Sequence, residues 1–486
     1  MIPVLLLIIP LLTGLLLFAV KNEKSAKNLA LLSSIATLTV SLLGVTYMKN
    51  AGYLDYDMEW MPALGSRFHV RLDGMGQILC LLTAISFPLI FVATYYNRYK
   101  NAASFYALML LSQAGLMGVF IAVDALLFYF FWELALIPVY FLCSIWGGEK
   151  RIAATFKFFI YTFAGSLLML LGLIYLYFKA NQSFSLEAFY AIQFKPGQDT
   201  AIFWMLFLAF AIKMPIFPFH TWQPDTYEQS PTAVTMVLSG IMVKMGVFGL
   251  LRWVVPVVPF SSWQLGDRIT IFALIGLIYA SLVAIKQDDL KRLVAYSSIA
   301  HIGLMCAAIF ATDKSATQGV MLQMFNHGIN IIGLWIVVDV IEQQFKTRKI
   351  SELGGVAQKA PALAILLVII AFANIGLPLT NAFIGEFMMF NGIFTSKATA
   401  FNVVFTIVAL VGIILSAVYT LNMIKKVFYG NTSELTSAGH DISFNVKLAL
   451  SIIVVLIIVL GVFPKPMLSV TNQLSDAILG RMYLKN

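Results

Sequence analysis

The sequence predicts an all-α polytopic membrane protein with about fourteen transmembrane helices. Hydrophobic residues make up 60% of the 486 residues and charged residues only 11%, a balance that water-soluble domains do not have. Residues 74–96 and 104–123 contain no charged side chain, and each run is long enough to cross about 30 Å of hydrocarbon as a helix. The net charge of +9 comes from Lys and Arg spread over short loops, which favours membrane topology over nucleic-acid binding.

Each expected span is an apolar run between charged residues or clusters of Pro and Gly. In chain order, their cores are residues 2–20, 28–48, 75–97, 103–122, 125–146, 156–178, 200–219, 232–251, 269–285, 292–311, 317–339, 361–390, 402–424 and 447–464. The two longest connections, 49–72 and 425–446, are too small to hold a core of their own, so no soluble domain is expected. Residues 1–20 lack the basic leading segment of a secretory signal, so they should remain as the first helix.

The distribution of basic residues predicts the orientation of these helices, because cytoplasmic loops carry the excess of Lys and Arg. With an even number of spans, both termini lie on one side of the membrane. The opposite side holds 18 of the 32 Lys and Arg, the side of the termini holds 12, and two lie inside the membrane. We therefore expect both termini outside the cytoplasm.

Four charged residues lie within the apolar runs and mark the expected functional site: Glu133, Lys213, Lys244 and Glu386. A charge at the centre of a membrane helix costs on the order of 2.5–3.5 kcal/mol on insertion scales, so such a residue indicates a function by default. Glu133 lies ~13 Å along a helix from Asp124, and Lys244 lies ~18 Å into its own span. Both should be near the middle of the membrane.

Two of the charged residues lie beside expected helix breaks. Lys213 precedes a pair of prolines that begins at Pro215, and Gly376 and Pro378 precede Glu386. Proline removes a backbone donor and clashes with the preceding turn, so each helix should be interrupted. Broken helices at corresponding places in two halves are typical of inverted repeats with an ion site near the membrane midplane. A simple kink is the alternative, since Pro is common in membrane helices.

These groups can move protons. Burial favours the neutral form of a lysine and a nearby carboxylate favours the charged form, so Glu133 beside Lys213 would act as a switch. Lys244 and two histidines could then carry a proton across the protein to Glu386. The alternative is that Glu133 and Lys213 form a static ion pair that joins two helices. Neither scheme requires a metal or an organic cofactor in this chain.

Five histidines have different expected roles. His301 and His327 lie on neighbouring spans, and we favour a proton relay for this pair over hydrogen-bonded packing. Histidine pairs also hold haem, so an electron carrier with a haem between these two residues is a competing hypothesis. His220 is a candidate cap of the broken helix. His69 and His440 are expected in loops without an assigned role.

The cysteines, the charged segment 288–292 and the absence of nucleotide-binding motifs limit the function further. Cys80, Cys143 and Cys306 lie in apolar runs without CxxC spacing, which argues against a disulfide framework, an iron–sulfur site or zinc. The charged segment 288–292 is interpreted as a solvated loop. The sequence contains no dinucleotide fingerprint and no P-loop motif, so neither kind of nucleotide site is visible in it.

Four segments resemble the antiporter-like membrane subunits of respiratory complex I (NADH:quinone oxidoreductase), and within them the M type. They are FFWELALIPVYFL, AFAIKMPIFPFHTWQPDTYEQSPTAVTMVLSGIMVKMGVFGLLR, KRLVAYSSIAHIGLM and GLPLTNAFIGEF. The resemblance implies that Glu133 is the family's glutamate of the fifth helix, Lys213 the lysine at the break of the seventh, and Lys244 the lysine of the eighth. Glu386 matches the acid of the twelfth helix, where the L and N types and the antiporter D subunits typically carry lysine.

The resemblance also implies an architecture and partners. Residues 1–102 would form three N-terminal helices, residues 103–253 and 254–430 two inverted five-helix repeats, and residues 431–486 the fourteenth helix and a tail. FMN, iron–sulfur clusters and quinone would be held by partner subunits, and the neighbours in the lipid bilayer would include the L and N subunits. A bacterial plasma membrane is favoured over a mitochondrial inner membrane.

Two further functions compete with this one. A subunit of a multi-subunit Na⁺/H⁺ antiporter or of a membrane-bound hydrogenase would share the ion-handling residues, and only Glu386 argues against it. A stand-alone metabolite carrier would need more polar clusters within its spans than the sequence contains.

Overall fold

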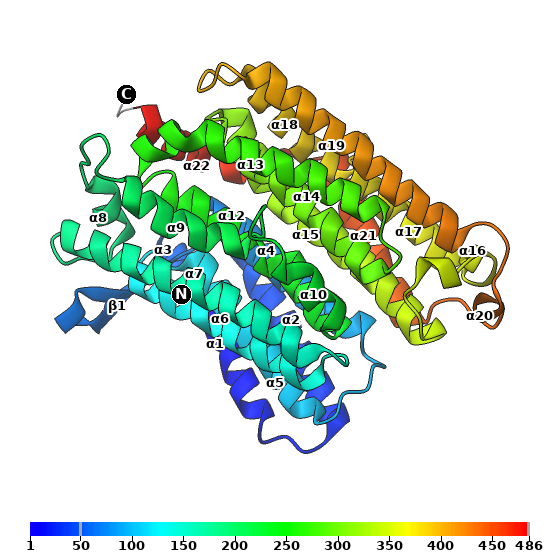
Figure 1. Ribbon diagram of the computed structural model, residues 1–486. Helices are drawn as coiled ribbons and strands as arrows, with labels where there is room; N and C mark the ends of the chain where they lie inside the picture. Colours follow the sequence, from blue (N-terminus) through cyan, green and yellow to red (C-terminus); the bar gives the residue numbers. More distant parts are fainter. Residues whose placement is uncertain (48–50, 484–486) are drawn as a thin grey trace.

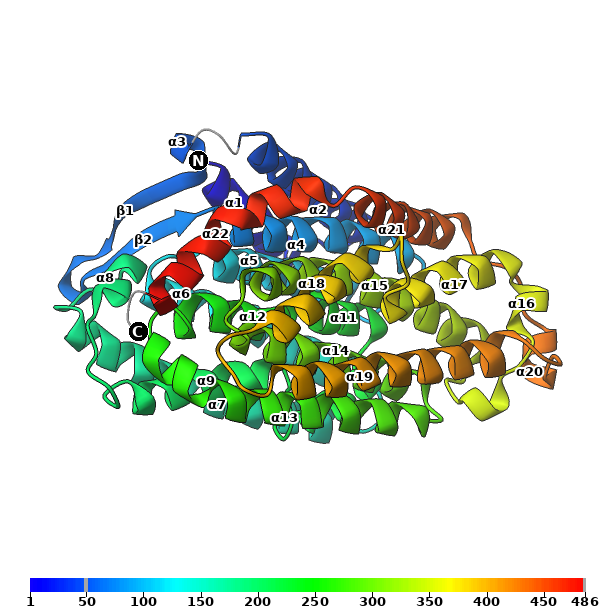
Figure 2. The same ribbon diagram turned by 90° about the horizontal axis from the view of Figure 1, so that it is seen from above.

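The long helices of the protein run roughly parallel to one another and form one elongated bundle (Figures 1 and 2). The computed structural model describes residues 1–47 and 51–483. Within these residues, eleven helices are long and apolar enough to cross a membrane. They are α2 (Glu23–Thr46), α4 (Gly74–Ala93), α5 (Ala102–Ile121), α6 (Ala125–Trp146), α7 (Arg151–Lys179), the continuous helix from α11 to η3 (Thr232–Val254), α13 (Pro259–Ile285), α14 (Leu290–Phe310), α15 (Lys314–Phe345), α19 with η5 (Asn402–Phe428) and α21 (Phe444–Val462).

Three shorter apolar helices complete the set: α1 (Ile2–Leu17), α9 (Thr200–Lys213) and α17 (Pro361–Ile375). Each of the long and short apolar helices corresponds to one predicted span, so the prediction of a polytopic helical protein is confirmed. The other helical elements are α3 (Ala51–Leu54), η1 (Pro62–Leu64), α8 (Leu186–Ala191), α10 (Trp222–Gln229), η4 (Ile350–Glu352), α16 (Val356–Lys359), α18 (Asn381–Thr395), α20 (Glu434–Ser437) and α22 (Lys465–Tyr483).

Both predicted breaks are present. Helix α9 ends at Lys213 and α10 begins only at Trp222, so the predicted span 200–219 stops six residues early and is followed by a non-helical segment. The predicted span 361–390 is divided into α17 and α18, and Gly376 at the break has a φ of +81°. This left-handed conformation carries no steric penalty for glycine.

A β-hairpin occupies the connection that the sequence analysis left without structure. Strand β1 (Asp55–Met61) pairs antiparallel with β2 (Ser66–Arg71), and Figure 2 shows the hairpin at one end of the bundle. Polar and apolar residues alternate along both strands, over 55–60 and over 67–71, which is the period-2 pattern of a half-exposed strand. Residues 48–50 of this connection lie outside the described residues.

The helices that carry the predicted charges form the centre of the bundle. The span Thr232–Val254 and α14 are buried along their whole apolar windows, and α15 almost so, whereas less than half of the window is buried in α7, α19 and α21. Inner helices can hold polar groups because protein rather than lipid surrounds them. Cys80, Cys143 and Cys306 are buried, and none of the three forms a disulfide within the described residues.

Candidate functional site

Three of the four predicted charges lie in the interior of the bundle. Lys244 has no exposed surface, Lys213 is 1% exposed and Glu386 is 3% exposed. Glu133 on α6 is only partly buried. Burial of three ionisable side chains without solvent is costly unless they have polar partners, so the contacts of each group decide what it can do.

Lys244, His327, His301 and Glu386 form a continuous row. Lys244 Nζ lies 2.9 Å from His327 Nδ1, the centres of the His327 and His301 rings are 5.3 Å apart, and His301 Nδ1 lies 3.5 Å from Glu386 Oε1. The Nε2 atoms of both histidines are buried without a hydrogen-bond partner among the described residues. Each histidine therefore has one ring nitrogen toward a charged group and one free to exchange a proton through water.

A local change in helix winding positions Lys244. Residues Leu238–Met242 form a π-helix, η2, and after Val243 the helix continues as α12 (Lys244–Gly249). The wider winding is typical of functional sites within helices. Here the backbone carbonyl of Ser239 accepts a hydrogen bond of 2.7 Å from Lys244 Nζ. The ammonium group is thus held between a carbonyl of its own helix and a ring of α15.

Glu386 has partners that the sequence analysis did not name. Gln323 Nε2 donates to Glu386 Oε1 at 3.2 Å, and Gln323 lies one helical turn before His327 on the same side of α15. A cavity of about 10 Å³ is lined by His301, Glu386 and Ser416, among others. This volume is at the lower limit of what a cavity needs to hold one water molecule, and the Ser416 hydroxyl beside it is buried without a partner among the described residues.

Lys213 lies against aromatic rings rather than against Glu133. Its Nζ atom is 5.4 Å from the centre of the Trp132 ring and 5.9 Å from that of Phe158, and cation–π contacts of this length stabilise a buried ammonium. Among the described residues, neither Lys213 Nζ nor Glu133 Oε1 has a hydrogen-bond partner. Glu133 acts on Lys213 electrostatically, but the static ion pair considered from the sequence is not formed, because α6 turns Trp132 toward the lysine.

The remaining histidines differ in part from expectation. The ring of His220 packs between Phe217 and Tyr279, and it is the backbone carbonyl of His220, not its ring, that bonds the start of α10. His69 lies in β2 rather than in a loop and contacts Asp55 at 2.8 Å. His440 lies in a loop as predicted.

The segment 288–292 is not a solvated loop, which corrects the sequence interpretation. Lys291 is 3% exposed and pairs with Glu342 at 2.9 Å, while Arg292 pairs with Asp225 and Glu228 of α10. The acids come from helices far away in the sequence. Folding therefore turns an apparently exposed charge cluster into a network that joins α10, α14 and α15.

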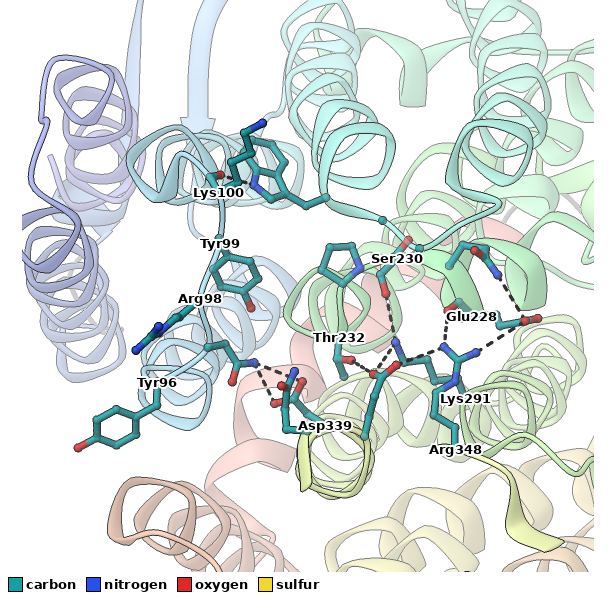
Figure 3. Close-up of a pocket in the computed structure, with 18 residues that line it drawn as sticks. Tyr96, Arg98, Tyr99, Lys100, Glu228, Ser230, Thr232, Lys291, Asp339 and Arg348 are labelled. Carbon is teal, nitrogen blue, oxygen red and sulfur yellow. Dashed lines mark hydrogen bonds and ion pairs between the residues drawn. The ribbon is translucent and has the colours of Figure 1, made fainter. Parts of the chain in front are cut away.

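The network borders a polar pocket of about 580 Å³ (Figure 3). The segment from Tyr96 to Lys100 forms one wall, and Glu228, Ser230, Thr232, Lys291 and Arg348 lie opposite (Figure 3). The pocket opens among the loops that hold the larger number of basic residues. The region that the structure describes contains no group of three or more His, Cys, Asp or Glu suited to a metal ion.

Comparison with known proteins gives consistent matches. Residues 122–418 match the family described as NADH:quinone oxidoreductase/Mrp antiporter, transmembrane. The chain is 35% identical to NADH-quinone oxidoreductase subunit M of Rickettsia conorii over 96% of this chain and 95% of that protein. It is 34% identical to F(420)H(2) dehydrogenase subunit M of Methanosarcina mazei over 99% of this chain and 98% of that protein.

A solved structure has the same fold over nearly the whole chain. A chain of respiratory complex I from Thermus thermophilus with bound NADH superposes with a TM-score of 0.91. The match covers 99% of this chain and 100% of that chain at 26% sequence identity.

Proposed function

This chain belongs to the NADH:quinone oxidoreductase/Mrp antiporter transmembrane family, and on that premise we propose that it is a proton-translocating membrane-arm subunit of an NADH:quinone oxidoreductase. Quinone is reduced in other subunits, and this chain moves protons through its buried Glu, Lys and His side chains. The observation that carries the proposal is the row from Lys244 through His327 and His301 to Glu386, whose polar atoms approach to 2.9 and 3.5 Å at its two ends.

The row can pass a proton because its members accept and release protons in turn. Lys244 gives a proton to His327, which faces it at hydrogen-bonding distance. His327 passes it to His301 through a water between their unpartnered Nε2 atoms. Glu386 then receives it from His301. Lys213 and Glu133 act before this row, and a change in the charge of Glu133 shifts the preference of Lys213 for its protonated form.

The proposal assigns cofactors and partners to the rest of the complex. FMN, iron–sulfur clusters and quinone belong to other subunits, and the L and N subunits are the expected neighbours in the membrane. We further propose residues 103–253 and 254–430 as the inverted repeats and a bacterial plasma membrane as the location.

The direct test is substitution in the assembled complex. Lys213→Ala and Glu133→Ala should each lower NADH-driven proton translocation, measured in proteoliposomes with a pH-sensitive dye, while the complex still assembles. Intact proton translocation in both variants would refute the role proposed for these residues.

A related complex with another electron donor is the second candidate, because one relative is a subunit of F(420)H(2) dehydrogenase and the family also includes antiporters. Purification of the native chain in mild detergent separates these functions. NADH:quinone reductase activity with flavin and iron–sulfur signals in the eluate supports the first proposal. Small membrane partners without redox activity would support an antiporter, and a haem absorption band would support the electron-carrier hypothesis.

A further inference from the structure

A row of hydroxyl groups leads from the polar pocket toward Lys244. Thr232 lines the pocket, and Thr235 and Ser239 follow it at spacings of three and four residues, which places all three on one face of the helix. Ser239 provides the carbonyl that binds Lys244. Polar side chains thus occupy one face of this buried helix from the pocket to the lysine.

Helix α10 adds two polar residues to the same region. Gln223 and Tyr227 are one helical turn apart, and the hydroxyl of Thr235 donates to the backbone carbonyl of Tyr227 at 3.4 Å, which places α10 against the hydroxyl row. Gln223, Tyr227 and Ser239 are fully buried. Yet both amide atoms of Gln223, the Tyr227 hydroxyl and the Ser239 hydroxyl lack hydrogen-bond partners anywhere in residues 1–47 and 51–483. Buried polar atoms without partners are costly, and a bound water is the usual explanation.

The other end of the same membrane helix is closed. Phe248 and Trp253 follow Lys244 on that side and pack against Phe128, with ring centres 6.4 and 4.9 Å apart. Arg252 lies over the Phe248 ring and pairs with Asp73. Aromatic rings offer a proton no hydrogen-bonded route. Lys244 therefore has a polar approach from the side of the pocket and an apolar barrier on the opposite side.

An ion pair lies where the row of hydroxyl groups meets the pocket. Lys291 Nζ donates to the backbone carbonyl of Ser230 at 3.3 Å and pairs with Glu342. Thr232 Oγ1 donates to Glu342 Oε2 at 3.1 Å. The first hydroxyl of the row is thus bonded to an acid that lines the pocket, and a proton taken up by Glu342 has a hydrogen-bonded path to Thr232.

We propose that Gln223, Tyr227 and Ser239 hold the water through which protons pass from the pocket to Lys244, with Tyr227 as the central positioning residue. Because the pocket lies among the loops richest in Lys and Arg, it faces the cytoplasm, and the route serves proton intake. The inference rests on the proposed function and adds the residues by which protons reach Lys244.

The test uses Tyr227→Phe in the complete complex, reconstituted in proteoliposomes. Removal of one hydroxyl should slow proton translocation several-fold, raise its solvent deuterium isotope effect and make it fall more steeply as the pH on the pocket side rises. Tyr227→His, which returns a polar atom to the ring, should restore much of the loss. Tyr106→Phe is the matched control, because Tyr106 is equally buried and its hydroxyl also lacks a partner among the described residues, but it lies on α5.

Each outcome has one meaning. A loss in Tyr227→Phe with a larger isotope effect, and none in Tyr106→Phe, supports the inference. If Tyr227→Phe translocates protons normally while Lys244→Met does not, the intake route is wrong and the proposed function stands. Normal translocation in Lys244→Met as well would overturn the proposed function itself. If Tyr227→Phe does not assemble, Ser239→Ala decides by the same measurements.

Discussion

Replacement of Gly376 by Ala, at the break between α17 and α18, should displace Glu386. It should thereby interrupt proton transfer along the row that ends at this residue. The glycine lies at the end of α17, and a Cβ atom added to it would be 2.1 Å from Glu386 Oε2. Real Cβ contacts do not fall below 3.0 Å. The carboxylate must therefore move by about 0.9 Å or more, because the side chain yields more easily than the backbone.

The Gly376→Ala change should act on stability through backbone strain and, separately, on proton translocation through the displaced carboxylate. Alanine at a φ of +81° costs about 1–2 kcal/mol in backbone strain, which lowers stability without touching the chemistry. The displaced carboxylate acts on function, since His301 Nδ1 is already 3.5 Å from Glu386 Oε1. A misplacement of about 1 Å can cost about 10²-fold in a reaction that depends on geometry. We expect a loss of proton translocation of up to this size.

The assay measures protons translocated per quinone reduced in proteoliposomes, together with assembly on native gels. Gly430→Ala is the matched control, because Gly430 has a φ of +85° and no atom lies within 4 Å of an added Cβ. It should show the same strain and normal translocation. The reasoning is refuted if assembled Gly376→Ala translocates as the wild type does, or if Gly430→Ala loses as much.

Three further changes test other parts of the structure. Gly115→Ala should lower the melting temperature of the complex, because its Cβ would lie 2.4 Å from the backbone nitrogen of Ala135 and overpacking costs about 1–3 kcal/mol. Trp222→Phe should increase hydrogen exchange around the first break, because the indole N–H bonds the Ile212 carbonyl at 3.0 Å and an unsatisfied buried carbonyl costs about 1–3 kcal/mol. Acid should open the β-hairpin. Burial raises the pKa of Asp55, but Arg71 and His69 together lower it by more, so the pKa of Asp55 lies below its ordinary value. Its stabilisation is therefore present above about pH 4 and is lost as the pH falls through the lowered pKa, so pepsin should cut residues 55–71 faster there.

Each of these has a control. Gly480→Ala meets no atom within 4 Å, and an equal loss of melting temperature there would contradict the packing argument. Trp335 is as buried as Trp222, but its indole nitrogen has no partner within the described part of the chain. Trp335→Phe should therefore leave exchange at the break unchanged. Asp55→Asn should remove the acid dependence of hairpin cleavage, and a dependence that persists would assign it to other groups.

The sequence alone determined the spans, the breaks and the four membrane charges. These are local properties: hydrophobic length decides whether a segment crosses the bilayer, and Pro215 and Gly376 interrupt a helix wherever it lies. The same reasoning placed His301 and His327 on neighbouring helices. It missed the β-hairpin, although polar and apolar residues alternate along both strands, and it missed residues such as Gln323 and Tyr227, which look ordinary until their neighbours are known.

Only the tertiary structure decided which groups meet. Lys244 and His327 are 83 residues apart in sequence and come together because the continuous helix Thr232–Val254 packs against α15 in the centre of the bundle. The rotation of α6 placed Trp132 rather than Glu133 against Lys213, and the fold paired Lys291 with Glu342. Hydropathy and spacing fix where a residue lies along its own helix, but the rotation of each helix and its partners depend on packing across the whole bundle.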